Sequence, residues 1–198
     1  LILTRAFHSL PSAIQDIVLV VGYLGDQIRE YFGDEFQGRS ITYVEQDEPK
    51  GTGHALCLCQ DLVRGRFLYL FADDLHGRAD LERITSYTRG MLVKPTETPE
   101  KFGVVVRHSD GTLAEFVEKP SHGQAPSNMA STGVFVLDKG IFKYPPEVKT
   151  NGEFYHTDMI IKYGKSNPLA VVEQELWLPI ATQEDVKSVE TELRIRAL

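Results

Sequence analysis

Short, unbroken apolar runs alternate in the first half of the chain with stretches in which apolar residues recur at helical spacing. The runs predict strands at 17–21, 41–44 and 67–71. Continuous β-branched and aromatic runs are typical of strands that are covered on both faces. Helical spacing follows at 26–32, 53–63 and 80–87, with Asp80 as the expected cap of the last helix. Alternation of this kind predicts a parallel sheet wrapped by helices.

The second half has a different pattern. Two strand-like stretches, 102–107 and 113–118, flank Ser109-Asp110-Gly111, which predicts a hairpin turn. Further strands are predicted at 132–137 and 169–173, and helices at 157–163 and 183–195. We therefore expect one domain over residues 1–198, of α/β class, with a mixed and mostly parallel sheet that carries helices on both faces.

The first ten residues do not fit a single element. Residues 1–3 resemble the end of a buried strand, and residues 4–10 resemble a helix, with no turn residues between them. Because a strand does not pass into a helix without a connection, the pattern predicts that residues are absent between Leu3 and Thr4.

Composition narrows the class of protein. The 198 residues are 42% hydrophobic and 25% charged, which is normal for a globular domain. The longest apolar runs are too short to span a bilayer, and no leader pattern opens the chain. Cys57 and Cys59 lie too close in sequence to favour a disulfide, so we expect a cytoplasmic protein. The net charge of −7 argues against nucleic acid as a partner.

Polar residues follow two of the predicted strands, where parallel sheets bind their ligands. Asp73 and Asp74 come directly after the run at 67–71. Adjacent carboxylates there suit Mg²⁺, although a turn or capping role explains them equally well. The segment 50–54 contains Gly51 and Gly53, which would let backbone amides approach a ligand; the alternative is a plain tight turn before a helix.

Two further places could carry charge to a substrate. Glu118 and Lys119 end a strand just before Pro120, where a carboxylate can accept sugar hydroxyls and an ammonium can neutralise phosphate. A solvated surface pair is the alternative. Asp158 precedes a helical pattern, either as a second metal ligand or as an acid that favours the positive end of the helix.

Taken together and in order, these segments resemble the sugar-1-phosphate nucleotidylyltransferase family. The segments that carry the resemblance are 20–23, Gln46 with 51–55, 70–75, 117–120, 125–130, 152–153 and 157–158. Those of the second half resemble the bacterial-type UTP–glucose-1-phosphate uridylyltransferases.

The resemblance implies a Rossmann-like, three-layer α/β/α fold and a Mg²⁺-dependent transfer between UTP and glucose 1-phosphate. Asp73 and Lys119 would be catalytic. The other implied roles are base contacts for Gln46, Gly51 and Thr52, magnesium binding for Asp73 and Asp158, sugar-phosphate contacts for Gly103, Glu118 and Lys119, and a sugar pocket at Thr132 and Gly133.

One departure keeps alternatives open. The family's glycine-rich signature, with its catalytic arginine and lysine, is expected after a first strand, and nothing in the chain matches it. Other nucleotide and sugar pairs (dTTP with glucose, GTP with mannose) stay possible, as do a nucleotide-sugar glycosyltransferase and a non-catalytic regulatory domain of the same fold. A homo-oligomer is compatible with all of them.

Overall fold

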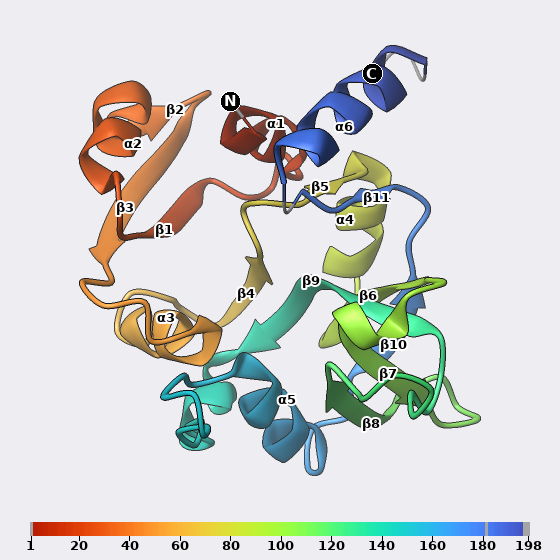
Figure 1. Ribbon diagram of the computed structural model, residues 1–198. Helices are drawn as coiled ribbons and strands as arrows, with labels where there is room; N and C mark the ends of the chain where they lie inside the picture. Colours follow the sequence, from red (N-terminus) through yellow and green to blue (C-terminus); the bar gives the residue numbers. More distant parts are fainter. Residues whose placement is uncertain (1, 181, 196–198) are drawn as a thin grey trace.

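The computed structural model describes residues 2–180 and 182–195 (Figure 1). The elements of the first half are α1 (Ile2–Ser9), β1 (Asp16–Val21), α2 (Gly25–Phe32), β2 (Glu35–Phe36), β3 (Arg39–Glu45), α3 (Thr52–Leu58), β4 (Arg66–Leu70), β5 (Leu75–His76), α4 (Arg78–Thr85) and β6 (Gly90–Pro95). Those of the second half are β7 (Gly103–Arg107), β8 (Leu113–Glu118), β9 (Met129–Asp138), α5 (His156–Gly164), β10 (Ala170–Glu173), β11 (Trp177–Leu178) and α6 (Gln183–Ile195). Short 3₁₀ turns, η1 (Pro99–Lys101) and η2 (Lys139–Lys143), add to them.

The strands form a small sheet, a large sheet and a two-stranded pair. The small sheet has the order β1-β3-β2, and the large sheet has the order β10-β6-β9-β7-β8, with β4 also paired to β9. The pair joins β11 to β5. Figure 1 shows the small sheet with α2 on one side of the molecule and most of the large sheet on the other, with β4 between them.

Both faces of the large sheet carry a helix, which confirms the predicted α/β class. Side chains of successive strand residues point to opposite faces. Met91 and Phe135 therefore pack with Ile160 and Tyr163 of α5, whereas Leu92 and Val134 pack with two residues of α4, Leu81 and Ile84. Leu81 and Ile84 are 0–1% exposed, and Ile160 and Tyr163 are 0% exposed. Each helix therefore covers one face of the large sheet.

One detail of the sheet differs from the expectation. Strands β4 and β6 run in the same direction, and β10 is parallel to β6. Strand β9 lies antiparallel between β4 and β6 and also pairs with β7. Because one long strand joins three neighbours in this way, more of the described pairings are antiparallel than parallel.

The predicted strand end at the start of the chain is wrong. Ile2 and Leu3 belong to helix α1, and residue 1 lies outside the described part. The helix is continuous through Leu3 and Thr4, so these residues do not form a strand end followed by a separate helix. Its apolar face explains the helix, because the ring of Phe7 stacks on Phe32 with 5.1 Å between centroids.

Two other local expectations need correction. Asp80 does not cap α4, whose N-cap residue is Gly77. Its buried carboxylate instead accepts hydrogen bonds from the backbone amides of Glu175 and Leu176, and it pairs with Arg83 at 2.6 Å. Strand β6 was not predicted, although it lies inside the large sheet. Within the described residues, no helix is long and apolar enough to cross a membrane.

Candidate active site

The two aspartates after β4 have different surroundings. Asp74 accepts a hydrogen bond from Nε1 of Trp177 at 2.8 Å and another from the amide of Ile180 at 3.3 Å. Burial raises the pKa of Asp74 to about 6. Asp73 is exposed, and its carboxylate has no hydrogen-bond or ion-pair partner in the part of the chain that the structure describes. Asp74 is thus engaged in the fold, and Asp73 is the carboxylate available to a ligand.

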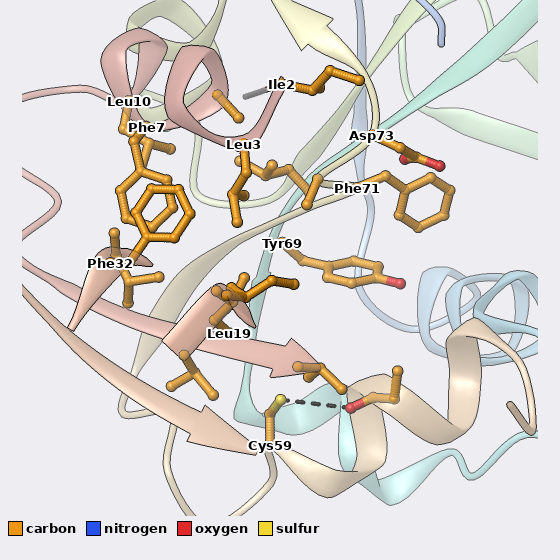
Figure 2. Close-up of a pocket in the computed structure, with 18 of the residues that line it drawn as sticks. Ile2, Leu3, Phe7, Leu10, Leu19, Phe32, Cys59, Tyr69, Phe71 and Asp73 are labelled. Atoms are coloured by element: carbon orange, nitrogen blue, oxygen red, sulfur yellow. Dashed lines mark hydrogen bonds between the residues drawn. The ribbon is translucent and has the colours of Figure 1, made fainter. Parts of the chain in front are cut away.

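Asp73 lies on the wall of the main cavity, which has a volume of about 1080 Å³. Thr52, at the start of α3, lines the same cavity. In Figure 2, Tyr69, Phe71 and Asp73 follow one another along one side of it. One predicted base-binding residue, Thr52, and one predicted metal ligand, Asp73, therefore line the same cavity. The lining does not include Gln46, Gly51 or Asp158.

The packing of the chain requires a glycine in the predicted nucleotide-binding segment, whatever the segment binds. Gly51 has a φ of +91°, and a Cβ at this position would lie 2.6 Å from the carbonyl oxygen of Phe154. The amide of Gly53 donates to that same oxygen at 2.8 Å. Gln46 donates through Nε2 to the carbonyl of Gly51 at 3.2 Å and lies 2.8 Å from Nδ1 of His54. The glycines are thus explained by the tight turn, and this explanation is compatible with a role of the segment in ligand binding.

A buried histidine joins Thr52 to the second half of the chain. The Oγ1 of Thr52 lies 2.8 Å from Nδ1 of His156, the first residue of α5. Burial lowers the pKa of His156 to about 4, so the ring is neutral at physiological pH. Phe71 and Tyr69 hold the ring edge-on at centroid distances of 5.2 and 5.9 Å. His156 thereby fixes α5 against both α3 and the end of β4.

The predicted sugar-binding residues at the end of β8 lie beside the start of α5. Glu118 is opposite Gly103 in the β7–β8 hairpin, and its carboxylate accepts a hydrogen bond from the hydroxyl of Thr157 at 2.6 Å. A Cβ at position 103 would lie 2.5 Å from the ring of Phe116, so the close packing there requires glycine. Lys119 follows with a φ of +41°, an unfavourable backbone conformation for a residue with a side chain.

Thr132 and Gly133 belong to β9, which pairs with β7 at Ala130. The Thr132 hydroxyl is 1% exposed and lies 2.8 Å from Oε1 of Gln174 and 3.1 Å from the carbonyl of Leu92. That side chain is engaged in the interior, so Thr132 could meet a sugar only through its backbone. Gly133 has a φ of +74°, and a Cβ there would lie 2.6 Å from the ring of Phe71. The absence of a side chain at Gly133 therefore leaves room for the ring of Phe71 beside His156.

Asp158 pairs with Lys149, whose Nζ lies 2.6 Å from Oδ1. No cluster of three or more potential metal ligands occurs among the residues that the structure describes. That does not argue against Mg²⁺, which takes one or two carboxylates and completes its shell with water and substrate phosphates. The exposed carboxylate of Asp73 fits such an ion. Asp158 fits it only after Lys149 has moved from that oxygen.

The predicted residues thus form two groups joined by α5. Thr52 and Asp73 lie at the cavity, and Glu118 and Gly103 lie at the end of the β7–β8 hairpin. Sequence reasoning missed the residues that connect them, His156 and Lys149. Proximity in the chain to Thr157 and Asp158 was the available signal. His156 pairs with Thr52, 104 positions away, which leaves no local pattern, whereas Lys149 lies only nine positions from its partner Asp158.

The chain is an α/β protein with a Rossmann-like sheet and an exposed carboxylate after one of its strands, which is where such sheets bind their ligands. The chain belongs to the nucleotidyl transferase family, since the family model of that description matches residues 1–193. It is 29% identical to UTP–glucose-1-phosphate uridylyltransferase AglF of Haloferax volcanii, over 98% of this chain and 84% of that protein. It is 27% identical to the bifunctional protein GlmU of Methanococcus maripaludis, over 94% of this chain. The chain spans 45% of that relative and 38% of GlmU from Methanocaldococcus jannaschii.

Solved structures agree with this assignment. A protein of Bacillus anthracis described as a glucose-1-phosphate thymidylyltransferase, in complex with sucrose, is similar with a TM-score of 0.82 and 28% identity, covering 98% of this chain and 82% of that one. A UDP-glucose pyrophosphorylase complexed with UDP-glucose gives the same TM-score at 20% identity, covering 98% of this chain and 85% of that one. The fold is that of the nucleotide-diphospho-sugar transferases.

Proposed function

We propose that the protein is a sugar-1-phosphate nucleotidylyltransferase that makes UDP-glucose and pyrophosphate from UTP and glucose 1-phosphate. A phosphate oxygen of the sugar would attack the α-phosphorus of UTP. A new P–O bond forms to the sugar phosphate, and the bond to pyrophosphate breaks. Such transfers depend on positioning and charge neutralisation more than on a covalent nucleophile.

The observation that carries this proposal is the free carboxylate of Asp73 in a cavity that Thr52 also lines. Bound Mg²⁺ would neutralise phosphate charge there. In this assignment Asp73 and, after release of Lys149, Asp158 would hold the ion. Gln46, Gly51 and Thr52 would contact the base.

The sugar side rests on the end of the β7–β8 hairpin. Glu118 would accept hydroxyl groups of the sugar, with Thr157 fixing its carboxylate by the 2.6 Å hydrogen bond. Gly103 would leave room for the ring, and exposed Lys119 would neutralise the sugar phosphate. Thr132 and Gly133 would contribute backbone from β9. A cytoplasmic location is part of the same proposal.

The UTP–glucose pair is supported by the segments of the second half and by the similarity to AglF. A second candidate is dTTP with glucose 1-phosphate, which the 28% identical Bacillus anthracis protein favours. The test measures pyrophosphate release with UTP, dTTP, CTP and GTP against glucose 1-phosphate and mannose 1-phosphate. We expect UTP with glucose 1-phosphate to be fastest. Exclusive use of dTTP would overturn the choice of nucleotide.

Two variants test the site itself. Asp73→Asn should remove magnesium-dependent turnover, and Asp74→Asn, its neighbour in the chain, should retain it. Transfer of glucose from UDP-glucose to an acceptor without pyrophosphate release would instead indicate a glycosyltransferase. Nucleotide binding without any turnover in the unaltered full-length protein would indicate a regulatory domain.

A further inference from the structure

The two carboxylates proposed to hold the metal differ in whether they already have a partner. Asp73 is exposed and has no hydrogen-bond or ion-pair partner among the described residues. Asp158 is paired, because Nζ of Lys149 lies 2.6 Å from its Oδ1. Two cations on one carboxylate oxygen repel each other. The Oδ1 of Asp158 can therefore serve Lys149 or a divalent cation, but not both.

Burial explains why Asp158 needs this partner. Its side chain is 16% exposed, and a carboxylate that is largely withdrawn from water requires a compensating charge or hydrogen bonds. The amide of Glu147 donates to Oδ2 at 3.4 Å, which is a long hydrogen bond. Within the described residues, Lys149 is the cation that pairs with Asp158. Its ammonium thus supplies the positive charge that a bound metal ion would otherwise supply.

Backbone hydrogen bonds hold Lys149 in a short hairpin. Its amide donates to the carbonyl of Glu153 at 2.8 Å, and its carbonyl accepts from the amide of Gly152 at 2.9 Å. Phe154 then exchanges two hydrogen bonds of 2.8 Å with the segment 50–53. The hairpin is therefore anchored to the predicted nucleotide-binding segment, and its backbone is fixed there.

The side chain of Lys149 is free to move where its backbone is not. It is 37% exposed, and a lysine ammonium is carried on a flexible four-carbon stem. Rotation about the bonds of that stem is enough to take Nζ away from Oδ1. Release of Asp158 thus requires a change of rotamer and no rearrangement of the fold.

We propose that Lys149 is a positioning residue that holds Asp158 as its counter-ion and exchanges with the divalent cation when the nucleotide binds. The proposal rests on the proposed role of Asp158 as a metal ligand. Mg²⁺ takes one or two carboxylates and depends on substrate phosphates to complete its shell. Lys149 therefore keeps Asp158 until those phosphates are present, and metal binding at Asp158 is tied to the nucleotide.

The size of the effect follows from how often the pair is open. If Lys149 covers Asp158 for about nine-tenths of the time, a metal ion meets the free carboxylate for about one-tenth of it, and its affinity is lowered about tenfold. Removal of the ammonium should restore that factor in the absence of nucleotide.

The first experiment measures Mn²⁺ binding to the full-length protein without nucleotide, from the electron paramagnetic resonance signal of free Mn²⁺. We expect Lys149→Met to bind Mn²⁺ about tenfold more tightly than the unaltered protein. Lys149→Arg, which can pair with Asp158 again, should bind no more tightly than the unaltered protein. Equal affinities of the unaltered protein and Lys149→Met would overturn the proposal.

Lys162→Met is the matched control. Lys162 is also 37% exposed and pairs with Glu147 at 2.7 Å, so its loss changes the net charge equally without freeing Asp158. We expect no gain of Mn²⁺ affinity in this variant. A gain as large as that of Lys149→Met would show a general effect of charge and would also overturn the proposal. Asp158→Asn added to Lys149→Met should abolish the gain.

The second experiment needs no variant. The unaltered protein is acetylated on its lysines at increasing Mn²⁺ concentration, and the rate at each lysine is followed by peptide mass spectrometry, with Lys162 as the internal reference. We expect saturating Mn²⁺ to speed acetylation of Lys149 by up to about tenfold, since the ion releases its ammonium. An unchanged rate at Lys149 would contradict the exchange.

Neither readout uses turnover, so the two proposals can fail separately. A tighter Mn²⁺ site in Lys149→Met without pyrophosphate release from UTP would support the exchange and contradict the proposed reaction. Turnover of UTP and glucose 1-phosphate with the same Mn²⁺ affinity in both proteins would support the reaction and overturn the exchange.

Discussion

His76 should make the stability of the protein depend on pH in mildly acidic solution. Burial lowers its pKa from 6.5 to about 4. In β5, its side chain faces Gln174, whose Nε2 lies 3.4 Å from Nδ1. Its Nε2 has no hydrogen-bond partner among the described residues. Gln174 and Asp80 favour the charged ring, but burial outweighs both of them.

The sign follows from linkage. The unfolded chain binds the proton with a pKa near 6.5, and the folded chain binds it only near 4, so acid favours the unfolded state. The His76 contribution is complete above about pH 6.5 and is lost as the pH falls toward 4. At pH 5 the loss amounts to about 2 kcal/mol, from roughly 1.5 pH units at about 1.36 kcal/mol each.

The assay is urea unfolding of the protein and of His76→Gln at pH 7.5 and pH 5. Other titrating groups cancel in the difference between the two profiles. We expect the unaltered protein to lose about 2 kcal/mol more than the variant over this interval. His122→Gln, at an exposed position, is the control and should follow the unaltered protein. Parallel profiles for the protein and His76→Gln would refute the reasoning.

Two further comparisons use matched neighbours. Asp74→Ala should lower the free energy of unfolding by about 1–3 kcal/mol, because it leaves a buried indole N–H unpaired. Asp73→Ala should leave urea unfolding nearly unchanged. A larger loss for Asp73→Ala than for Asp74→Ala would contradict the assignment of their roles. Gly133 and Gly123 share a φ of +74°, but only Gly133 has a ring against the position of a Cβ. Gly133→Ala should therefore cost about 1–3 kcal/mol more than Gly123→Ala in thermal unfolding, and equal costs would show that the ring of Phe71 moves freely.

The strands that the sequence predicted well are those whose own composition decides the structure. Unbroken apolar runs at 17–21 and 67–71 form β1 and β4 within one residue of the expected ends. Strand β6 was missed because Gly90 opens it and Pro95 closes it, and its three central apolar residues are too few for a pattern. Its place is decided by pairing with β9 and β10, which are distant in sequence.

At the start of the chain, a local pattern predicted a strand that the structure does not have. An apolar triplet is compatible with a strand or with one face of a helix. Contacts of Phe7 with Phe32 and Phe36, at 5.1 and 5.4 Å between centroids, settle it as helix. Likewise the adjacent carboxylates of Asp73 and Asp74 are equivalent in sequence, and the hydrogen bonds that Asp74 accepts from Trp177 and Ile180 distinguish them.

The geometry of the candidate site follows from the start of α5. His156 contacts Thr52 on the proposed nucleotide side at 2.8 Å, and the next residue, Thr157, donates to Glu118 on the proposed sugar side at 2.6 Å. Because both residues belong to one rigid helical turn, the separation between the two sides is fixed by α5 and not by the loops that carry the polar groups. Burial of Ile160 and Tyr163 against the large sheet anchors that helix. The apolar core thereby sets the distance over which a sugar phosphate could meet a nucleotide.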